Sequence, residues 1–182
     1  NFGNICAGIL AHHRGLPVEH FIAACNVNDV VPEYLRTEIL KPKETVATIS
    51  NAMDVGDPSN FVRILELFDK EFNQVKNKLS GYTIDDEETL KTIERVEKDY
   101  GYVLDPHGAV AFLALEKYLA ENGGKGFFLE TAHPVKFPDS VEQATGKSVE
   151  IPKSLEELMK QEKFTTEINP QYEELKGFLL KK

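Results

Sequence analysis

Apolar runs and helical repeats alternate along the first part of the chain. Small apolar residues from about 4 to 14 predict a buried helix that ends at Gly15, and the continuous apolar run 21–25 predicts an inner parallel strand. Asp29 stands where it can cap a helix that continues to about Glu38. Because helix, strand and helix follow one another, we expect an α/β fold of three layers with a parallel sheet at its core.

A longer helical repeat occupies residues 60–79. Asp57 and Pro58 stand where a helix cap and a first helical residue are expected, and the stretch 45–49 before them is β-branched and could be extended. Apolar residues then recur at helical spacing and predict one long helix. These residues are Phe61, Ile64, Leu65, Phe68 and Phe72.

The second part of the chain contains two further helix signals and one strand signal. Acidic residues 85–88 begin a helix that ends near Gly101, since the helix dipole favours negative charge in the first turn. Asp105 and Pro106 begin the next helix, which ends at glycines 123–124. The remaining segments are a second candidate inner strand at 126–131, short helices at 138–145 and 154–163, and a charged tail to residue 182.

Composition limits the classes of function. The chain has 182 residues, of which 41% are hydrophobic, so it can form a packed core. Its 21 basic and 30 acidic residues give a net charge of -9, which argues against nucleic acids or an anionic membrane as partners. No apolar run approaches the ~20 residues of a membrane span. Cys6 and Cys25 lie in apolar surroundings, so we expect free buried thiols and no metal site.

The start of the chain has the pattern of an anion-binding turn. Gly3 permits an unusual backbone turn between Asn1 and Asn4, and a helix begins immediately afterwards. A helix amino terminus offers unpaired N–H donors and partial positive charge, which suit a phosphate group. A plain turn that enters a helix is the alternative. Since the chain opens on this turn without a methionine, we expect sequence upstream of it.

Two later motifs place polar residues beside predicted element ends. Asp105 and His107 stand at a helix start, where ligand contacts are common, although a cap followed by a surface histidine is equally consistent. Thr131 and His133 follow the candidate strand 126–131, at the position where parallel sheets bind ligands. Alternatively, Thr131 satisfies a strand end and His133 packs at the surface.

Together, the motifs resemble those of the threonine synthase family. Five blocks occur in the order found in that family: Asn1–Asn4, Ala24–Asp29, Asn51–Arg63, Asp105–Ala109 and Thr131–Phe137. The resemblance extends from Asn1 to about Gly146, and no motif of the family is found after that residue.

The resemblance implies a fold and a cofactor. Threonine synthases are pyridoxal-phosphate (PLP) enzymes of fold type II, the tryptophan-synthase-β-like class, and form L-threonine and phosphate from O-phospho-L-homoserine and water. The chain would then be the carboxy-terminal part of the catalytic domain. Carried over from the family, the residues that hold the cofactor phosphate are Asn1, Phe2, Gly3 and Asn4, and Thr131 contacts the pyridine nitrogen. Asp105, His107 and His133 are expected near the active site.

One element of the family pattern is missing from these residues. No lysine stands in the motif that carries the Schiff-base lysine, and Lys136 belongs to a different motif. We therefore expect the chain alone to be inactive and to bind PLP weakly at best. The resemblance also implies a cytoplasmic protein with a small-molecule substrate, without nucleic-acid or membrane partners, and a homo-oligomer could cover the face left by an absent half.

Three alternatives stay open at this point. The first is another fold type II enzyme, such as a serine or threonine dehydratase. The second is a non-catalytic, synthase-like module that binds phosphate or a partner. The third, an unrelated acidic α/β domain, would require all five blocks to be coincidence.

Overall fold

The structure, a computed structural model, describes residues 1–181 and comprises two compact units. We call residues 1–149 the body and the residues from 150 onward the tail. The body contains α1 (Gly3–His13), β1 (Phe21–Cys25), α2 (Val30–Thr37), η1 (Asn51–Met53), α3 (Phe61–Leu67), α4 (Phe72–Lys78), β2 (Leu79–Thr83), α5 (Asp86–Tyr100), α6 (Pro106–Asn122), η2 (Pro134–Lys136) and α7 (Pro138–Thr145). The tail contains α8 (Lys153–Met159) and α9 (Tyr172–Leu180).

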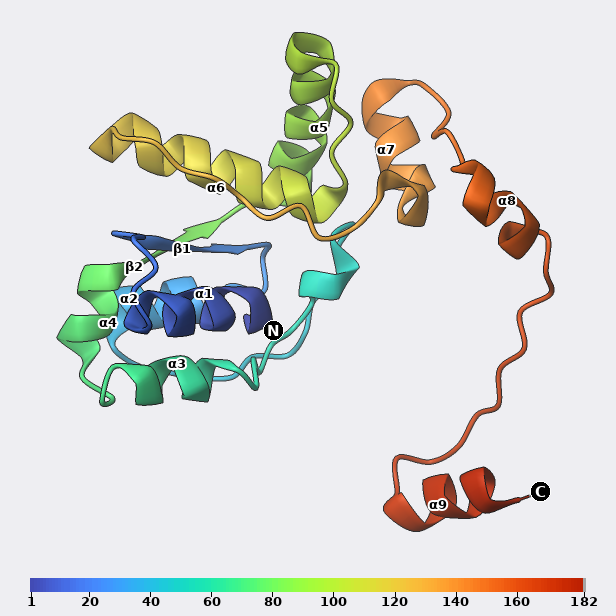
Figure 1. The fold of residues 1–182 in the computed structure, drawn as a ribbon, viewed down its shortest axis with the longest axis horizontal. Helices are drawn as coiled ribbons and strands as arrows, with labels where there is room; N and C mark the ends of the chain where they lie inside the picture. The colour runs from blue at the N-terminus through green and yellow to red at the C-terminus, as the bar shows by residue number, and fades with distance from the viewer. Residues whose placement is uncertain (182) are drawn as a thin grey trace. The chain divides into compact units, whose positions relative to one another are not determined.

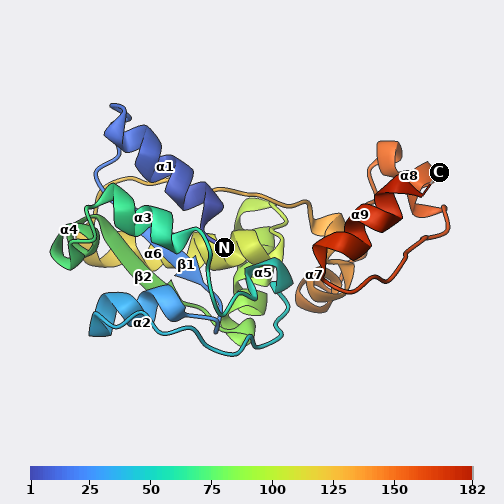
Figure 2. The same cartoon turned by 90° about the horizontal axis from the view of Figure 1, so that it is seen from below.

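A small parallel sheet lies at the centre of the body. β1 and β2 pair in parallel, with Ala23 opposite Gly81. α6 covers one face of the sheet, and α1 and α2 cover the other (Figure 1). Seen from the second face, α1 and α2 flank the strands and α3 lies alongside α1 (Figure 2). The three-layer α/β arrangement expected from the sequence is therefore confirmed.

The main core fills the face of the sheet that α1 and α2 cover. Its side chains interlock closely: a Cβ atom at Gly81 would lie 2.8 Å from the backbone of Pro32, so only glycine lets α2 approach β2 this closely. The buried members are Ile9, Ala23, Val31, Tyr34, Leu35, Phe61, Ile64, Phe68, Val75 and Leu79.

A second, smaller core joins α5 to α6. Its buried residues are Ile93, Val96, Leu104 and Ala109. α5 starts as its acidic first turn predicts, since Asp85 and Glu88 form a reciprocal capping box. α6 starts at Pro106, with the side chain of Asp105 as its cap. Both helices predicted in this region are confirmed.

The predicted helix 60–79 is wrong in its second half. α3 ends at Leu67, Asp69 and Lys70 take left-handed backbone conformations with φ values of 54° and 61°, and α4 follows as a separate helix. Residues 79–83 form β2 rather than the end of a helix. The apolar spacing continues through the break, because both short helices bury one side in the same core.

The predicted strand 126–131 is also wrong. These residues pair with no strand in the part of the chain that the structure describes, and two of their apolar side chains are exposed, Phe127 at 70% and Leu129 at 51%. The stretch 45–49 likewise forms no regular element. Apolar character alone predicted a strand, but strand formation needs a neighbouring strand as well.

The remaining expectations concern the cysteines, the short helices and membrane segments. Cys6 and Cys25 are free thiols, and only Cys25 is fully buried. α7 and α8 occupy the stretches predicted as short helices. Among residues 1–181, none of the helices is both long enough and apolar enough for a membrane crossing.

Candidate active site

The residues predicted to hold a phosphate form the first turn of α1. Phe2 is the helix N-cap with a left-handed backbone, φ 58° and ψ 22°, and its side chain caps nothing. The first helical hydrogen bond runs from the Cys6 amide to the Phe2 carbonyl, so the amides of Gly3 and Asn4 have no acceptor within the helix. A left-handed residue followed by free helix amides forms a concave set of donors that suits an anion.

Contacts with the loop before α3 hold this turn in place. The side-chain oxygen of Asn1 accepts hydrogen bonds from the Ser59 hydroxyl at 3.0 Å and from the Asn60 amide at 3.4 Å. The ring of Phe2 packs against Phe61, with the centroids 6.3 Å apart. Because an aromatic residue in the left-handed region is strained, these contacts stabilise a conformation that the turn would not adopt unaided.

The turn lies near the carboxyl end of β1. Burial, and then the charge of Asp29, raise the pKa of the Cys25 thiol to about 12. In Figure 1, α1 begins at the end of the body at which β1 stops, so the turn and the carboxyl end of β1 lie at one edge of the sheet. Ligands bind at this edge in parallel sheets.

Immediately after β1, two buried asparagines bind the loop 45–56. The amide nitrogens of Asn26 and Asn28 donate to one carboxylate oxygen of Asp54, at 2.8 and 3.2 Å. The same oxygen accepts from the Thr48 hydroxyl at 2.7 Å, and the other oxygen accepts from the Thr48 amide at 2.9 Å. The buried network is closed, because each of these donors reaches an ionised acceptor. Its role is to hold the loop against the end of the sheet.

The same loop bonds to His107 at the start of α6. The Ala52 amide donates to His107 Nε2 at 3.2 Å, so this nitrogen is an acceptor and Nδ1 carries the proton. His107 Nδ1 then donates to Asp105 Oδ1 at 2.5 Å, and the backbone amide of His107 donates to the same oxygen at 2.7 Å. Both ring nitrogens are occupied, so His107 connects the loop to α6 and is not free to exchange a proton with a ligand.

Glu130 supplies a second carboxyl group beside Asp105 at the start of α6. Asp105 is fully buried, and burial tends to raise its pKa, but hydrogen bonds from His107 and Glu130 outweigh burial and lower it below the ordinary value. Burial, followed by the hydrogen bond and charge of Asp105, raises the pKa of Glu130 to about 8. The pKa of Asp105 is therefore lowered and that of Glu130 raised, so that of the two carboxyl groups Glu130 keeps its proton to the higher pH.

The predicted residues after Glu130 are at the surface. Thr131 and His133 are exposed, and so is Lys136. His133 accepts a hydrogen bond from the Val135 amide at 3.2 Å and thereby caps η2. Thr131 keeps an accessible hydroxyl, which is the property that a contact with a ligand requires.

The structure thus separates the predicted residues into two kinds. Asp105 and His107 are buried connectors, not groups at the mouth of a cleft, and His107 is not a surface histidine. Sequence reasoning missed Glu130 and the role of Asn26 and Asp54. A charged residue at the end of the apolar run 126–129 was the available signal for Glu130, since such a residue needs a partner once it is buried.

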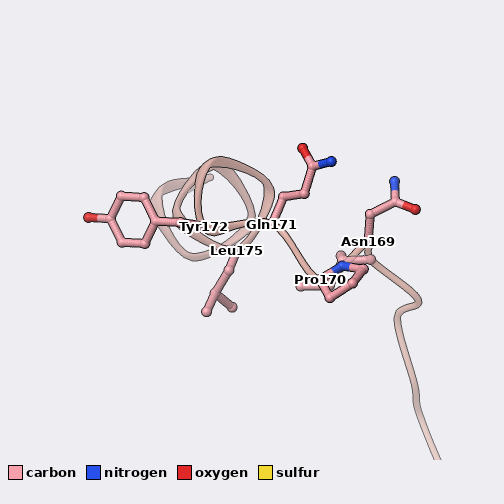
Figure 3. Close-up of a pocket in the computed structure, with 6 residues that line it drawn as sticks. Asn169, Pro170, Gln171, Tyr172 and Leu175 are labelled. Atoms are coloured by element: carbon pink, nitrogen blue, oxygen red, sulfur yellow. The ribbon is translucent and has the colours of Figure 1, made fainter.

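The surface hollows are lined by other residues. One surrounds the start of α9 and is lined by Ile168, Asn169, Pro170, Gln171, Tyr172 and Leu175 (Figure 3). Another is lined by His12, His13, Phe68, Gln74, Asn77 and Lys78. The tail hollow is shallow, and its lining has no carboxylate, lysine or histidine for acid–base chemistry. Neither hollow includes a residue of the five motif blocks, so the polar groups at the sheet edge are the better candidate site.

Comparison with known proteins identifies the family. The family model "Threonine synthase, C-terminal" matches residues 108–179. The threonine synthase of Escherichia coli K12 is 48% identical over 157 residues, which are 86% of this chain and 36% of that protein. That of Buchnera aphidicola from Acyrthosiphon pisum is 42% identical over 182 residues, covering 100% of this chain and 42% of that protein.

Solved structures give the same answer. The crystal structure of the Escherichia coli enzyme matches with a TM-score of 0.88 and 43% identity, over 98% of this chain and 41% of that one. The PLP-bound threonine synthase from Brucella melitensis matches with a TM-score of 0.81 and 29% identity, over 98% and 44%. The chain spans about two fifths of the length of these relatives. It belongs to the threonine synthase family and corresponds to the carboxy-terminal part of its members.

Proposed function

We propose that the protein containing these residues is a PLP-dependent threonine synthase that converts O-phospho-L-homoserine and water into L-threonine and phosphate. The observation that carries the proposal is the turn Asn1–Asn4, whose free amides lie at the carboxyl edge of the sheet. In the Brucella melitensis relative, a fold of the same kind binds PLP. The substrate is a small molecule, and the protein acts in the cytoplasm.

The turn would hold the phosphate of the cofactor. The amides of Gly3 and Asn4 supply donors, and the α1 amino terminus supplies partial positive charge. The positive φ of Phe2 fits this role, because it directs successive amides to one point. No lysine or arginine is needed there, since a helix terminus alone favours an anion.

Thr131 would contact the pyridine nitrogen. Bound PLP supplies an electron sink for reactions at the carbons of an amino acid. A neutral hydroxyl, unlike a carboxylate, leaves the ring nitrogen less positively charged, and this favours elimination and replacement of a phosphate group. Thr131 is exposed and so has a hydroxyl available for this contact. Asp105 and His107 would hold the neighbouring loop against α6, and His133 would cap η2 beside Thr131.

The covalent attachment of the cofactor needs a lysine from another part of the protein, and a homo-oligomer could complete the assembly. The 182-residue chain by itself would then show no synthase activity. This follows from chemistry, because PLP catalysis requires an amine within reach of the aldehyde, and none of the proposed site residues is a lysine.

The test combines the chain with the amino-terminal part of the Escherichia coli relative and uses two variants of Thr131. Thr131→Val removes the hydroxyl at nearly constant shape, and Thr131→Ser keeps it. We expect kcat to fall at least about tenfold in the valine variant, because a contact worth ~1.4 kcal/mol in the transition state is lost, and to stay near wild type in the serine variant.

The visible absorption of bound PLP provides the second measurement. We expect the band to shift in Thr131→Val and not in Thr131→Ser, since the charge of the ring nitrogen changes only in the former. Equal rates and spectra in all three proteins would refute the role of Thr131. Absence of both PLP binding and phosphate release would instead favour a non-catalytic module.

A further inference from the structure

The segment 126–132 lies along α6 without the support of a sheet. Its side chains alternate in exposure as in an extended strand: Phe128 and Glu130 are half-buried, whereas Phe127, Leu129 and Thr131 are exposed. The ring of Phe128 packs at right angles to Phe112 of α6, with centroids 5.5 Å apart. Because the segment has no strand partner among the described residues, its position depends on its inward-facing side chains.

Two glycines allow the segment to approach α6 closely. A Cβ atom at Gly126 would lie 2.5 Å from Leu115 Cδ1, and one at Gly108 would lie 2.1 Å from Glu130 Oε2. The carboxyl group of Glu130 therefore rests directly on the first turn of α6. This is the inward contact nearest to Thr131 along the chain.

Buried carboxyl oxygens at this contact have no hydrogen-bond donor unless Asp105 and Glu130 share one proton. Asp105 Oδ2 and both carboxyl oxygens of Glu130 are buried and lack a hydrogen-bond partner of good geometry. The backbone amide of Asp105 lies near enough to Glu130 to lower its pKa slightly, but it does not offset burial. Asp105 Oδ1 already accepts two N–H groups from His107. A single proton on Glu130, donated to Asp105 Oδ2, gives both carboxyls a partner, and two ionised carboxylates in one buried place would repel each other.

The groups that face the pair do not supply a compensating cation. His107 faces it from α6, and Tyr102 faces it from the loop before α6, where burial, followed by the charges of Glu130 and Asp105, raises the pKa of the tyrosine. Within residues 1–181, neither carboxyl forms an ion pair with lysine or arginine. The proton is therefore the only neutralising charge that this part of the structure offers.

We propose that Glu130, through a proton shared with Asp105 above Gly108, is the positioning residue that fixes Thr131 beside the first turn of α6. The inference deepens the proposed function, since it explains how a segment outside the sheet presents its hydroxyl in one place. Successive residues of an extended segment face opposite sides, so anchoring Glu130 inward directs Thr131 outward.

The proposal has a defined pH dependence. Glu130 has a pKa of about 8 in the folded chain, against an ordinary value of 4.5. Because folding raises the pKa of Glu130, the protonated form of this residue stabilises the fold. The stabilisation is fully present below pH 4.5 and is lost as the pH rises to about 8. Asp105 has the opposite effect on stability. Because folding lowers its pKa, its ionised form stabilises the fold, and this stabilisation is lost only as the pH falls below the ordinary value of 3.8.

The experiment is an NMR titration of the 182-residue chain between pH 4 and pH 10, without PLP. We expect the carboxyl carbon of Glu130 to titrate near pH 8 and the backbone amide signal of Thr131 to move with the same midpoint. The equilibrium constant for unfolding, measured in urea, should rise between pH 5 and pH 8 in the wild-type chain. This rise should be roughly tenfold or more greater than the rise in Glu130→Gln.

Four variants give the test its controls. Glu130→Gln keeps a neutral donor and should hold Thr131 at its wild-type position at every pH. Glu130→Ala and Gly108→Ala, which remove or displace the carboxyl, should shift the Thr131 signal at every pH. Glu94→Gln, an exposed glutamate on α5, should behave as wild type. An ordinary titration of Glu130 near pH 4.5, or a Thr131 signal still pH-dependent in Glu130→Gln, would overturn the proposal whether or not PLP binds.

Discussion

The body and the tail use apolar residues in different ways. In the body, side chains from α1, α2, α3, α4 and both strands bury one another, and Phe61 and Ile64 are almost completely inaccessible. The tail contains apolar residues as well, but Phe164 is 87% exposed and Leu179 is 68% exposed. An apolar residue stabilises a fold only through what covers it. We therefore expect the stability of the chain to reside in the body.

The largest effect should come from the main core. Ile64→Ala should lower the free energy of unfolding by about 2–5 kcal/mol, because it leaves a cavity between α3 and the sheet. Val62→Ala on the same helix is the matched control, since Val62 is 54% exposed. Urea denaturation measures both. Similar losses in the two variants would contradict the assignment of the core.

The buried network after β1 should rank second. Asp54→Ala removes the carboxylate that the amide groups of Asn26 and Asn28 share and that also accepts from Thr48, and we expect a loss of about 2–3 kcal/mol. Asp57→Ala, an exposed position in the same loop, should cost little. Thermal unfolding of both variants would distinguish them, and an unchanged Asp54→Ala protein would show that the loop is held by other contacts.

A smaller effect is expected at the start of α5. Asp85→Ala removes one half of the capping box and should cost about 1 kcal/mol. Asp99→Ala, near the other end of α5, provides the comparison, because Asp99 is exposed and caps nothing. Urea unfolding followed by circular dichroism gives the two midpoints. Equal midpoints would mean that the cap contributes nothing.

The smallest effect belongs to the tail. Leu179→Ala in α9 should change the free energy of unfolding of the body by less than about 0.5 kcal/mol, because Leu179 is largely exposed. A loss of 2 kcal/mol or more in urea would break the comparison, since it would show that α9 packs as the body helices do.

The sequence predicted the parts of the body whose signals are local. The cap at Asp105, the acidic first turn at 85–88 and the termination at Gly15 depend on residues next to one another, and the structure confirms all three. Two other predicted caps are wrong: the Asp29 side chain makes no cap hydrogen bond, and α3 begins at Phe61 after Asn60 rather than at Asp57 and Pro58. β1 was predictable because it is a short, uninterrupted run of apolar residues. Each of these features is decided within a few residues of the chain.

Features that depend on distant partners were missed. β2 contains a serine and a glycine and lies at the end of a helical repeat, so its pairing with β1 leaves no local signature. Residues 126–131 looked like a strand but have no neighbour to pair with among the described residues. The link between Glu130 and Asp105 likewise joins residues far apart in the sequence.

The candidate site shows the same division. The nearness of Asp105 and His107 to the active site stays a prediction, whereas the geometry makes both residues connectors between α6 and the loop 45–56. The turn at Asn1–Asn4 was predicted from glycine and the helix start, but the residue expected to take the unusual backbone conformation was wrong: Phe2 is left-handed, whereas Gly3 is the first residue of the helix. The turn Asn1–Asn4 and the exposed Thr131 keep the roles that the family resemblance implies, and both roles stay predictions.

The most direct test of the account is reconstitution of the enzyme. The 182-residue chain and the amino-terminal part of the Escherichia coli threonine synthase are mixed with PLP, and phosphate release from O-phospho-L-homoserine is measured. The account predicts no release from either part alone and steady release, with formation of L-threonine, from the mixture. A mixture in which the two parts bind each other and PLP but release no phosphate would contradict it.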